Sequence, residues 1–200
     1  MNDYGERITE YKNKNKSNAR FLFSFLFVVL WLAAFIGANR CFFYYIEVEG
    51  PSMNDTLYTG DVLCVERYRA PEYGSVVIIA GEKGDDTCLI KRVVGMEGDT
   101  IVIEGGEVYR NGEKLEEAYA LGKTYVNRSP ERKEYTVGEN EIFYLGDNRE
   151  NSNDSRSEMA CCTEDQIIGV VPEWAMSGFM KWFSGARADV GKWLTSLFGL

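Results

Sequence analysis

The chemistry available to this chain is limited first by a residue type that it lacks. None of its 200 residues is histidine. Ser/His/Asp catalysis, Cys/His catalysis and zinc sites built on imidazole are therefore excluded. A hydrolase made from this sequence needs another base for a hydroxyl nucleophile, and a neutral lysine is the available choice. Because the pKa of an ordinary lysine is ~10.4, such a lysine must be desolvated until its charged form is disfavoured.

One lysine lies in an apolar strand pattern. In the segment Leu89–Val94 (LIKRVV), strict alternation places Lys91 on one face with the apolar Leu89 and Val93. Arg92 falls on the opposite face, so we expect only one of the two basic groups to face solvent. A lysine on a strand is usually a solvated edge residue, so this pattern alone does not identify a catalytic base.

Two further segments are rich in hydroxyl, amide and carboxyl groups. Gly50–Leu57 (GPSMNDTL) reads as a turn that contains Ser52, and Gly146–Arg156 (GDNRENSNDSR) is dense in Asp, Asn and Ser. A serine in such a turn is ordinarily a turn former. The second segment could be a capped loop or a calcium loop, but the spacing of an EF-hand fails because its central glycine and closing acid are not in place.

An uncharged segment precedes these three stretches and must hold them near a membrane. Residues 21–39 carry no charge between Arg20 and Arg40, and as a helix they would span ~28 Å, close to the hydrocarbon thickness of a bilayer. A cleaved signal peptide is the alternative, but its apolar core would be shorter and small residues would follow it. We expect an uncleaved anchor with residues 1–20 in the cytoplasm and everything after Arg40 outside.

The formal charge of −9 argues against nucleic acid as a partner.

The region after the anchor predicts a mainly β fold. Short β-branched and aromatic runs recur between turn signals in residues 40–173, which we assign to one antiparallel β domain. Asn111-Gly112 predicts a two-residue hairpin turn, and residues 116–140 look like a surface excursion. The expected strands are 44–48, 61–65, 76–79, 88–94, 100–103, 107–109 and 142–145.

Residues 174–200 differ from the β region. Apolar and aromatic residues recur there at steps of three and four, as on an amphipathic helix. Their aromatic side chains suit a membrane interface, although packing on the domain is the alternative. The five cysteines show no metal-binding spacing, and no disulfide pairing can be deduced from them.

Taken together, the three segments resemble the motifs of type I signal peptidases, also called leader peptidases. Residues 52–61 resemble the family pattern S-M-x-P-T-L with G-D shortly after it, and residues 91–99 resemble K-R-V-x-G-x-P-G-D. Residues 146–156 match G-D-N-x-x-x-S-x-D-S-R at every defined position. Asp55 and Glu97 stand where the family usually has proline, which puts the rigidity of those loops in doubt but not the reaction type.

The resemblance implies a membrane-anchored serine endopeptidase without a cofactor or metal. Ser52 would attack the scissile carbonyl, and an uncharged Lys91 would take its proton and later protonate the leaving amine. Ser152 would hydrogen-bond the Lys91 amine and fix its rotamer, and Asp154 and Arg156 would form an ion pair that holds the loop.

The resemblance also implies how the substrate is held. The peptide would lie as an added strand with small side chains at −1 and −3, and Val48 and Val77 match positions that line those pockets. The oxyanion should be bound by the backbone N–H of Ser52. Gly50 stands where some relatives have a side-chain donor and offers only backbone.

The expected partners are therefore signal peptides of exported preproteins, the lipid bilayer and, transiently, the export machinery. Two alternatives remain open. One is a Ser/Lys protease with a narrow client such as a pilus or surface component, and the other is a non-catalytic, tethered β module. The related self-cleaving repressors are disfavoured by the anchor and by the missing DNA-binding region.

Overall fold

A long helix, α1 (Asp3–Phe42), dominates the first of the two units into which the chain divides, residues 1–42 and 43–200. The computed structural model describes residues 3–81, 87–157 and 160–176. The helix already begins at Asp3, well before the expected anchor, because no proline interrupts the sequence up to its end. Residues Arg20–Phe42 are long and apolar enough to cross a membrane. The boundary expected between tail and anchor stays a prediction.

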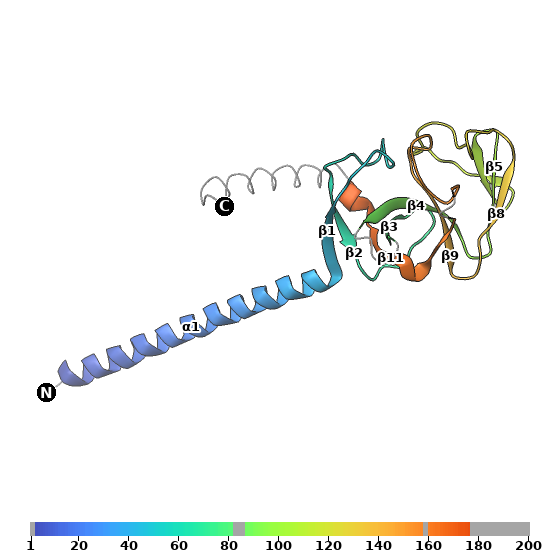
Figure 1. Ribbon diagram of the computed structural model, residues 1–200. Coiled ribbons are helices and arrows are strands. Elements are labelled where there is room, and N and C mark those ends of the chain that lie inside the picture. Colours follow the sequence, from blue (N-terminus) through green and yellow to red (C-terminus); the bar gives the residue numbers. More distant parts are fainter. Residues whose placement is uncertain (1–2, 82–86, 158–159, 177–200) are drawn as a thin grey trace. The chain divides into compact units, whose positions relative to one another are not determined.

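The second unit is built from two antiparallel sheets, and Figure 1 shows β1 and β2 of the larger sheet at one end of the unit and β5 and β8 of the smaller sheet at the other. The larger sheet has seven strands in the order β1 (Phe43–Glu47), β2 (Val62–Glu66), β11 (Ile167–Val171), β3 (Val76–Ala80), β4 (Cys88–Met96), β9 (Glu141–Leu145) and β10 (Cys162–Thr163). The smaller sheet has the order β7 (Glu113–Lys114), β6 (Glu107–Arg110), β5 (Thr100–Glu104) and β8 (Lys133–Thr136). Two short 3₁₀ helices, η1 (Glu164–Gln166) and η2 (Glu173–Met176), follow the last hairpin strands.

The mainly antiparallel β fold with a preceding apolar helix is confirmed. Each of the seven expected strands is present, with ends that differ from the prediction by one or two residues. The predicted hairpin joins β6 to β7, and Asn111 and Gly112 both have positive φ, at 53° and 85°. A two-residue turn of this type requires that conformation at both positions, which explains why this short motif is so predictive.

Of the eleven described strands, β8, β11 and the short β10 were not expected from the sequence. β11 lies between β2 and β3, and its Gly169 approaches β2 so closely that a Cβ would lie 2.9 Å from the Glu66 carbonyl oxygen. The glycine hides the strand from a pattern-based prediction but permits the close approach. β8 pairs with β5 inside the region predicted as a surface excursion. That prediction was wrong, since Thr124 and Val126 of the same region are also buried.

The hydrophobic core fills the space beside and between the sheets. One cluster joins the two sheets through residues of β4, β5, β6 and β9. A second cluster, around β1, β2 and β3, includes Met53 and Leu57, which follow the predicted nucleophile Ser52 by one and five residues in the sequence. The turn that carries Ser52 is therefore anchored in the core on its apolar side.

The predicted C-terminal helix lies almost entirely outside the described residues. Within residues 174–200, the structure describes only the end of η2, where Ala175 is buried in the core. The five cysteines form no disulfide in the described part of the chain.

Candidate active site

Ser52 is presented by a tight turn between β1 and β2. Gly50 enters the turn with a φ of +86°, which glycine adopts without strain. The amides of Asn54 and Leu57 donate to the carbonyls of Pro51 and Met53, at 3.1 and 2.8 Å. Since Met53 and Leu57 are fully buried while Ser52 is only partly buried, the turn fixes the backbone and leaves the hydroxyl accessible.

Lys91 lies in the middle of β4 and reaches this hydroxyl. Its Nζ is 2.9 Å from Ser52 Oγ and donates to the Ile90 carbonyl at 3.0 Å. The side chain is only 3% exposed, and Val77 is its direct partner on β3. The strand alternation therefore places the amine on an apolar face, as predicted, and a turn 39 residues earlier supplies its partner.

The surroundings of Lys91 favour its neutral form. Burial lowers the pKa of Lys91 from 10.5 to about 8, although the charges of Asp154 and Asp147 act in the opposite direction. Desolvation disfavours the ammonium ion because it removes the water that stabilises the charge. A neutral amine is thus accessible near neutral pH, as a general base requires.

Arg92 corrects one prediction. Neither of the two adjacent basic groups faces solvent, since Arg92 is 7% exposed. Its Nε and Nη2 donate to both carboxylate oxygens of Asp147 at 2.8 and 2.6 Å, and its Nη1 donates to the Gly74 carbonyl at 2.7 Å. The strand alternation assigned Arg92 to the correct face, opposite that of Lys91. It could not show that the buried Asp147 carboxylate lies on that face.

The loop of residues 146–156 packs against the serine turn. A Cβ on Gly146 would lie 2.6 Å from the Ser52 carbonyl oxygen and would collide with the hydroxyl of Ser152, so only glycine fits. Asn148 donates its backbone N–H to the Ser52 carbonyl at 3.0 Å and its side-chain amide to the Pro51 carbonyl at 3.1 Å. The loop therefore brings Ser152 beside the nucleophile.

The predicted hydrogen bond between Ser152 and the Lys91 amine is not formed. Among the described residues, the Ser152 hydroxyl oxygen is buried and has no hydrogen-bond partner, while the amine contacts Ser52 and the Ile90 carbonyl. A buried hydroxyl without a partner is costly and calls for an explanation. Ser152 lies near the backbone carbonyl of Ser52, so a role in catalysis is the explanation to test.

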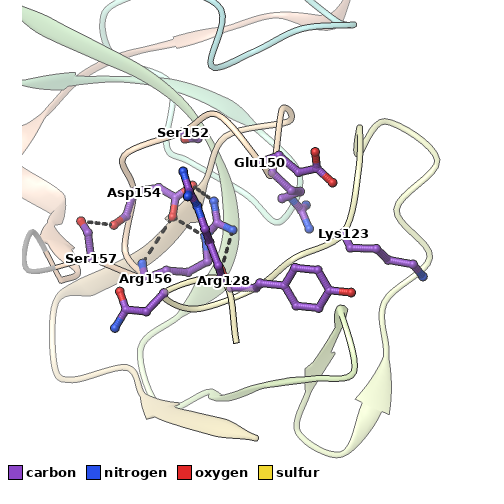
Figure 2. Close-up of a pocket in the computed structure, with 10 residues that line it drawn as sticks. Lys123, Arg128, Glu150, Ser152, Asp154, Arg156 and Ser157 are labelled. Carbon is purple, nitrogen blue, oxygen red and sulfur yellow. Dashed lines mark hydrogen bonds and ion pairs between the residues drawn. The ribbon is translucent and has the colours of Figure 1, made fainter. Parts of the chain in front are cut away.

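The predicted ion pair between Asp154 and Arg156 is present. Arg156 donates from Nε and Nη2 to the two carboxylate oxygens at 2.7 and 2.8 Å, and from Nη1 to the Tyr125 carbonyl at 3.1 Å. Asp154 also accepts from the Gly146 amide at 3.0 Å. Both residues line a pocket of about 480 Å³ together with Ser152 (Figure 2). The pair thus closes the loop onto its own first residue.

Ser52 and Lys91 also line an open groove of about 350 Å³. One wall is formed by residues 46–50, which include the end of β1 and the residues that follow it. The other wall is formed by residues 87–91 at the start of β4. Val48 is among the residues of the first wall, and its contact with substrate stays a prediction. Val77 is fully buried and is not among the groove residues, so its contribution in this structure is to the dry face around Lys91.

The donors available to an oxyanion are restricted at this turn. The backbone N–H of Gly50 already donates to Thr59 Oγ1 at 3.1 Å. Gly50 therefore does not supply the second donor in this conformation, and the backbone N–H of Ser52 stays the predicted one.

Several residues that shape the site escaped sequence reasoning. Asp147 is completely buried, accepts two hydrogen bonds from Arg92 and accepts a third from Thr56 Oγ1 at 2.5 Å. Thr56, Arg92 and Asp147 each come from a different one of the three segments. The sequence signal for these residues was that all three lie within the motif segments. That they contact one another could be seen only in the folded structure.

Comparison with known proteins finds a protein family and several relatives to which this chain is similar. The family described as "Signal peptidase, peptidase S26" matches residues 19–176. The signal peptidase I of Bacillus licheniformis is 30% identical over 177 residues, 81% of this chain and 91% of that protein. The probable signal peptidase I-1 of Synechocystis sp. is 34% identical over 151 residues, 70% of this chain and 72% of that protein. A crystal structure of a signal peptidase I from Enterococcus faecalis matches with 23% identity and a TM-score of 0.41, covering 52% of this chain and 98% of that chain.

Proposed function

Because this chain belongs to the signal peptidase family, peptidase S26, we propose that it removes N-terminal signal peptides from exported preproteins with Ser52 as nucleophile and Lys91 as general base. The observation that carries this assignment is the 2.9 Å contact between the buried Lys91 amine and the Ser52 hydroxyl. A nucleophile within hydrogen-bond reach of a base of lowered pKa is the arrangement that covalent catalysis requires.

The reaction follows from this geometry. Ser52 Oγ attacks the carbonyl carbon of the scissile bond while its proton moves to the neutral Lys91 Nζ. Collapse of the tetrahedral intermediate breaks the C–N bond, and the Lys91 ammonium returns the proton to the departing amine. An ester to Ser52 remains. Lys91 then deprotonates a water molecule that attacks the ester, and the proton returns to Ser52 as the signal peptide leaves.

The groove beside the dyad fits the part of the substrate that precedes the cleaved bond. Residues 46–50 and 87–91 flank it, so a peptide in extended conformation can lie between them and reach Ser52. We assign Val48 to the wall that receives a small side chain. The assignment of Val77 to a substrate pocket stays a prediction.

Anchoring by α1 supplies the location that this substrate requires. The segment Arg20–Phe42 is one helix that can cross a bilayer, and signal peptides are themselves apolar and membrane-bound. We propose that residues 1–20 lie in the cytoplasm and that the β unit lies outside, since basic residues flank the start of the segment.

The direct test is cleavage followed by identification of the new N-terminus. The detergent-solubilised full chain is incubated with a preprotein that has alanine at −1 and −3, and the product is sequenced. A single new N-terminus directly after the −1 residue is expected. A product cut elsewhere, or no product, contradicts the proposal.

Activity should rise with pH. Only the neutral form of Lys91 can accept the Ser52 proton, and its pKa is about 8. Below that pH, kcat/KM should fall about tenfold per pH unit, because the neutral fraction falls by that factor. Initial rates between pH 6 and pH 9 measure the profile. A profile that is flat over this range would show that Lys91 does not act as the base.

Ser152 is proposed to orient the Lys91 amine during the reaction. A neutral amine has two N–H groups and one lone pair. The lone pair faces Ser52 Oγ–H and one N–H donates to the Ile90 carbonyl, which leaves one N–H for the unpartnered Ser152 hydroxyl beside Ser52. We propose that this contact forms when substrate is bound.

Replacing Ser152 with alanine should therefore lower kcat by about ten- to hundredfold, the loss expected when a catalytic group is misplaced by about 1 Å. Thermal stability should not fall, because the lost hydroxyl makes no hydrogen bond in the described part of the resting structure. Ser129→Ala, outside the site, is the control. Unchanged kcat in Ser152→Ala would exclude the orienting role.

A further inference from the structure

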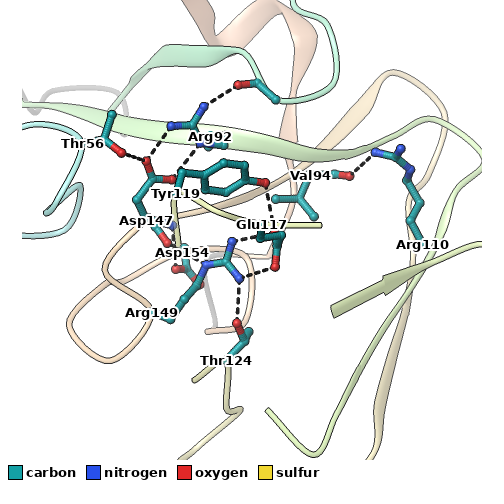
Figure 3. Close-up of polar contacts among 12 residues, drawn as sticks. Thr56, Arg92, Val94, Arg110, Glu117, Tyr119, Thr124, Asp147, Arg149 and Asp154 are labelled. Atoms are coloured by element: carbon teal, nitrogen blue, oxygen red, sulfur yellow. Dashed lines mark hydrogen bonds and ion pairs between the residues drawn. The ribbon is translucent and has the colours of Figure 1, made fainter. Parts of the chain in front are cut away.

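A closed ring of polar contacts surrounds the start of the 146–156 loop, and two of its members lie outside the three motif segments. They are Glu117 and Tyr119, which precede β8 in the chain. The ring, called here the polar ring, consists of Arg92, Asp147, Gly146, Arg149, Glu117 and Tyr119 (Figure 3). Neither Glu117 nor Tyr119 takes part in the reaction steps proposed above.

One side of the polar ring is formed by Arg149, which makes a bidentate contact with Glu117. Arg149 donates from Nη1 and Nη2 to the two carboxylate oxygens of Glu117 at 2.8 and 2.7 Å, and from Nε to the Gly146 carbonyl at 3.0 Å. Arg149 is 3% exposed. Hydrogen bonds between ionised partners are short and directional, and more so when water is excluded. Glu117 thus fixes the guanidinium that holds the Gly146 carbonyl.

The other side of the ring is Tyr119. Its hydroxyl donates to Glu117 Oε1 at 3.1 Å, and its ring lies with the centroid 4.0 Å from Arg92 Cζ. The Arg149 Cζ is 6.0 Å from the same centroid. A guanidinium over an aromatic face is attracted by the negative potential of the π system. Tyr119 therefore connects the two arginines that hold Gly146 and Asp147.

The residues held by the polar ring contact the turn that carries Ser52. Gly146 lies against the Ser52 carbonyl, and Asp147 accepts from Thr56 of the serine turn. Arg92 directly follows Lys91 on β4. We propose that Glu117 and Tyr119 are positioning residues for catalysis, which hold Gly146 and Asp147 so that the loop seals the Ser52–Lys91 pair from water. This inference rests on the proposed function.

The proposal predicts a change that a purely structural role would not cause. Asp147 and Asp154 are the charged groups that act on Lys91, and both are on the loop that the ring holds. If the loop loosens, water reaches the amine and the two carboxylates move away from it. The loss of desolvation is the larger of these two opposing effects, so the pKa of Lys91 rises toward 10.5. The pH at half-maximal kcat/KM then moves upward. Partial unfolding would lower the height of the profile and leave its midpoint in place.

The test compares Tyr119→Leu, Tyr119→Phe and Glu117→Gln in the full chain in detergent. We expect Tyr119→Leu to lower kcat by about ten- to hundredfold and to raise the midpoint of the pH profile. KM should change little, because no ring residue lines the substrate groove. Tyr119→Phe keeps the aromatic face over Arg92 and should restore most of kcat, and Glu117→Gln should lie between the two.

Tyr73→Leu is the matched control, since the Tyr73 ring stacks on Arg110 at 3.8 Å outside the polar ring. It should leave the midpoint unchanged. A reduced kcat with an unmoved midpoint in both Tyr119→Leu and Glu117→Gln would overturn the proposal, as would wild-type kinetics in all three variants. Failure of the proposed function is distinguishable, because the unaltered chain would then release no mature protein at any pH.

Discussion

Replacing Lys91 with methionine is expected to abolish signal peptide cleavage. Methionine fills a similar volume on the apolar face but cannot accept the Ser52 proton, so the nucleophile stays a neutral hydroxyl. Removing one member of a catalytic unit typically costs about 10⁴- to 10⁶-fold in kcat. Lys91→Arg should be as inactive, because a guanidinium does not lose its proton in proteins. Single-turnover cleavage of a preprotein measures the loss.

The control for this experiment is Lys133→Met, which removes an exposed lysine from β8 and should leave kcat unchanged. Retention of a tenth or more of the activity by Lys91→Met would show that another group acts as the base. The same experiment separates the protease from a non-catalytic β module, since such a module would bind peptides equally well with either residue.

Replacing Asp147 with alanine is expected to destabilise the β unit more than any surface substitution. The Arg92 guanidinium would remain buried with neither of its two carboxylate contacts, and the hydrogen bond from Thr56 to this carboxylate would be lost. Leaving one partner of a buried ion pair uncompensated costs about 3–5 kcal/mol in the free energy of unfolding. Proteolysis of the unfolded fraction in increasing urea measures this change, because it does not depend on activity.

Two further variants test the cause of this loss. Arg92→Met combined with Asp147→Leu should be less destabilising than Asp147→Ala alone, because no unpaired charge remains. Glu134→Ala removes an exposed ion pair with Arg132 and should change the free energy of unfolding by less than about 1 kcal/mol. A loss below that value in Asp147→Ala would contradict the role assigned to the buried pair.

The parts of the structure that depend on local pattern could be predicted from the sequence. The period of two assigned Lys91 to the face shared with Leu89 and Val93, and the Asn111-Gly112 turn followed from the φ values it requires. The resemblance supplied the pairing of Ser52 with Lys91 and of Asp154 with Arg156, and the structure brings both pairs into contact.

The remaining features of the site depend on contacts between residues far apart in the sequence, which a local pattern cannot predict. Arg92 and Asp147 are 55 residues apart, so a solvated arginine was the reasonable expectation until the fold placed a carboxylate beside it. Glu117 lies in a polar stretch that resembles an exposed loop, yet it pairs with a buried arginine. Ser152 was expected to contact the amine directly, but the backbone path of the loop leaves its hydroxyl unpartnered in the described structure.

The order of the strands has a consequence for synthesis of the protein. Ser52 is carried by the β1–β2 hairpin and Lys91 by the β3–β4 hairpin. Among the described strands, β11 is the one whose backbone hydrogen bonds join these two hairpins into one sheet, and it is made some 76 residues after Lys91. A nascent chain that has emerged as far as its nucleophile and its base therefore still lacks the strand that joins them. The sheet that carries both residues can therefore be completed only after β11 has been synthesised.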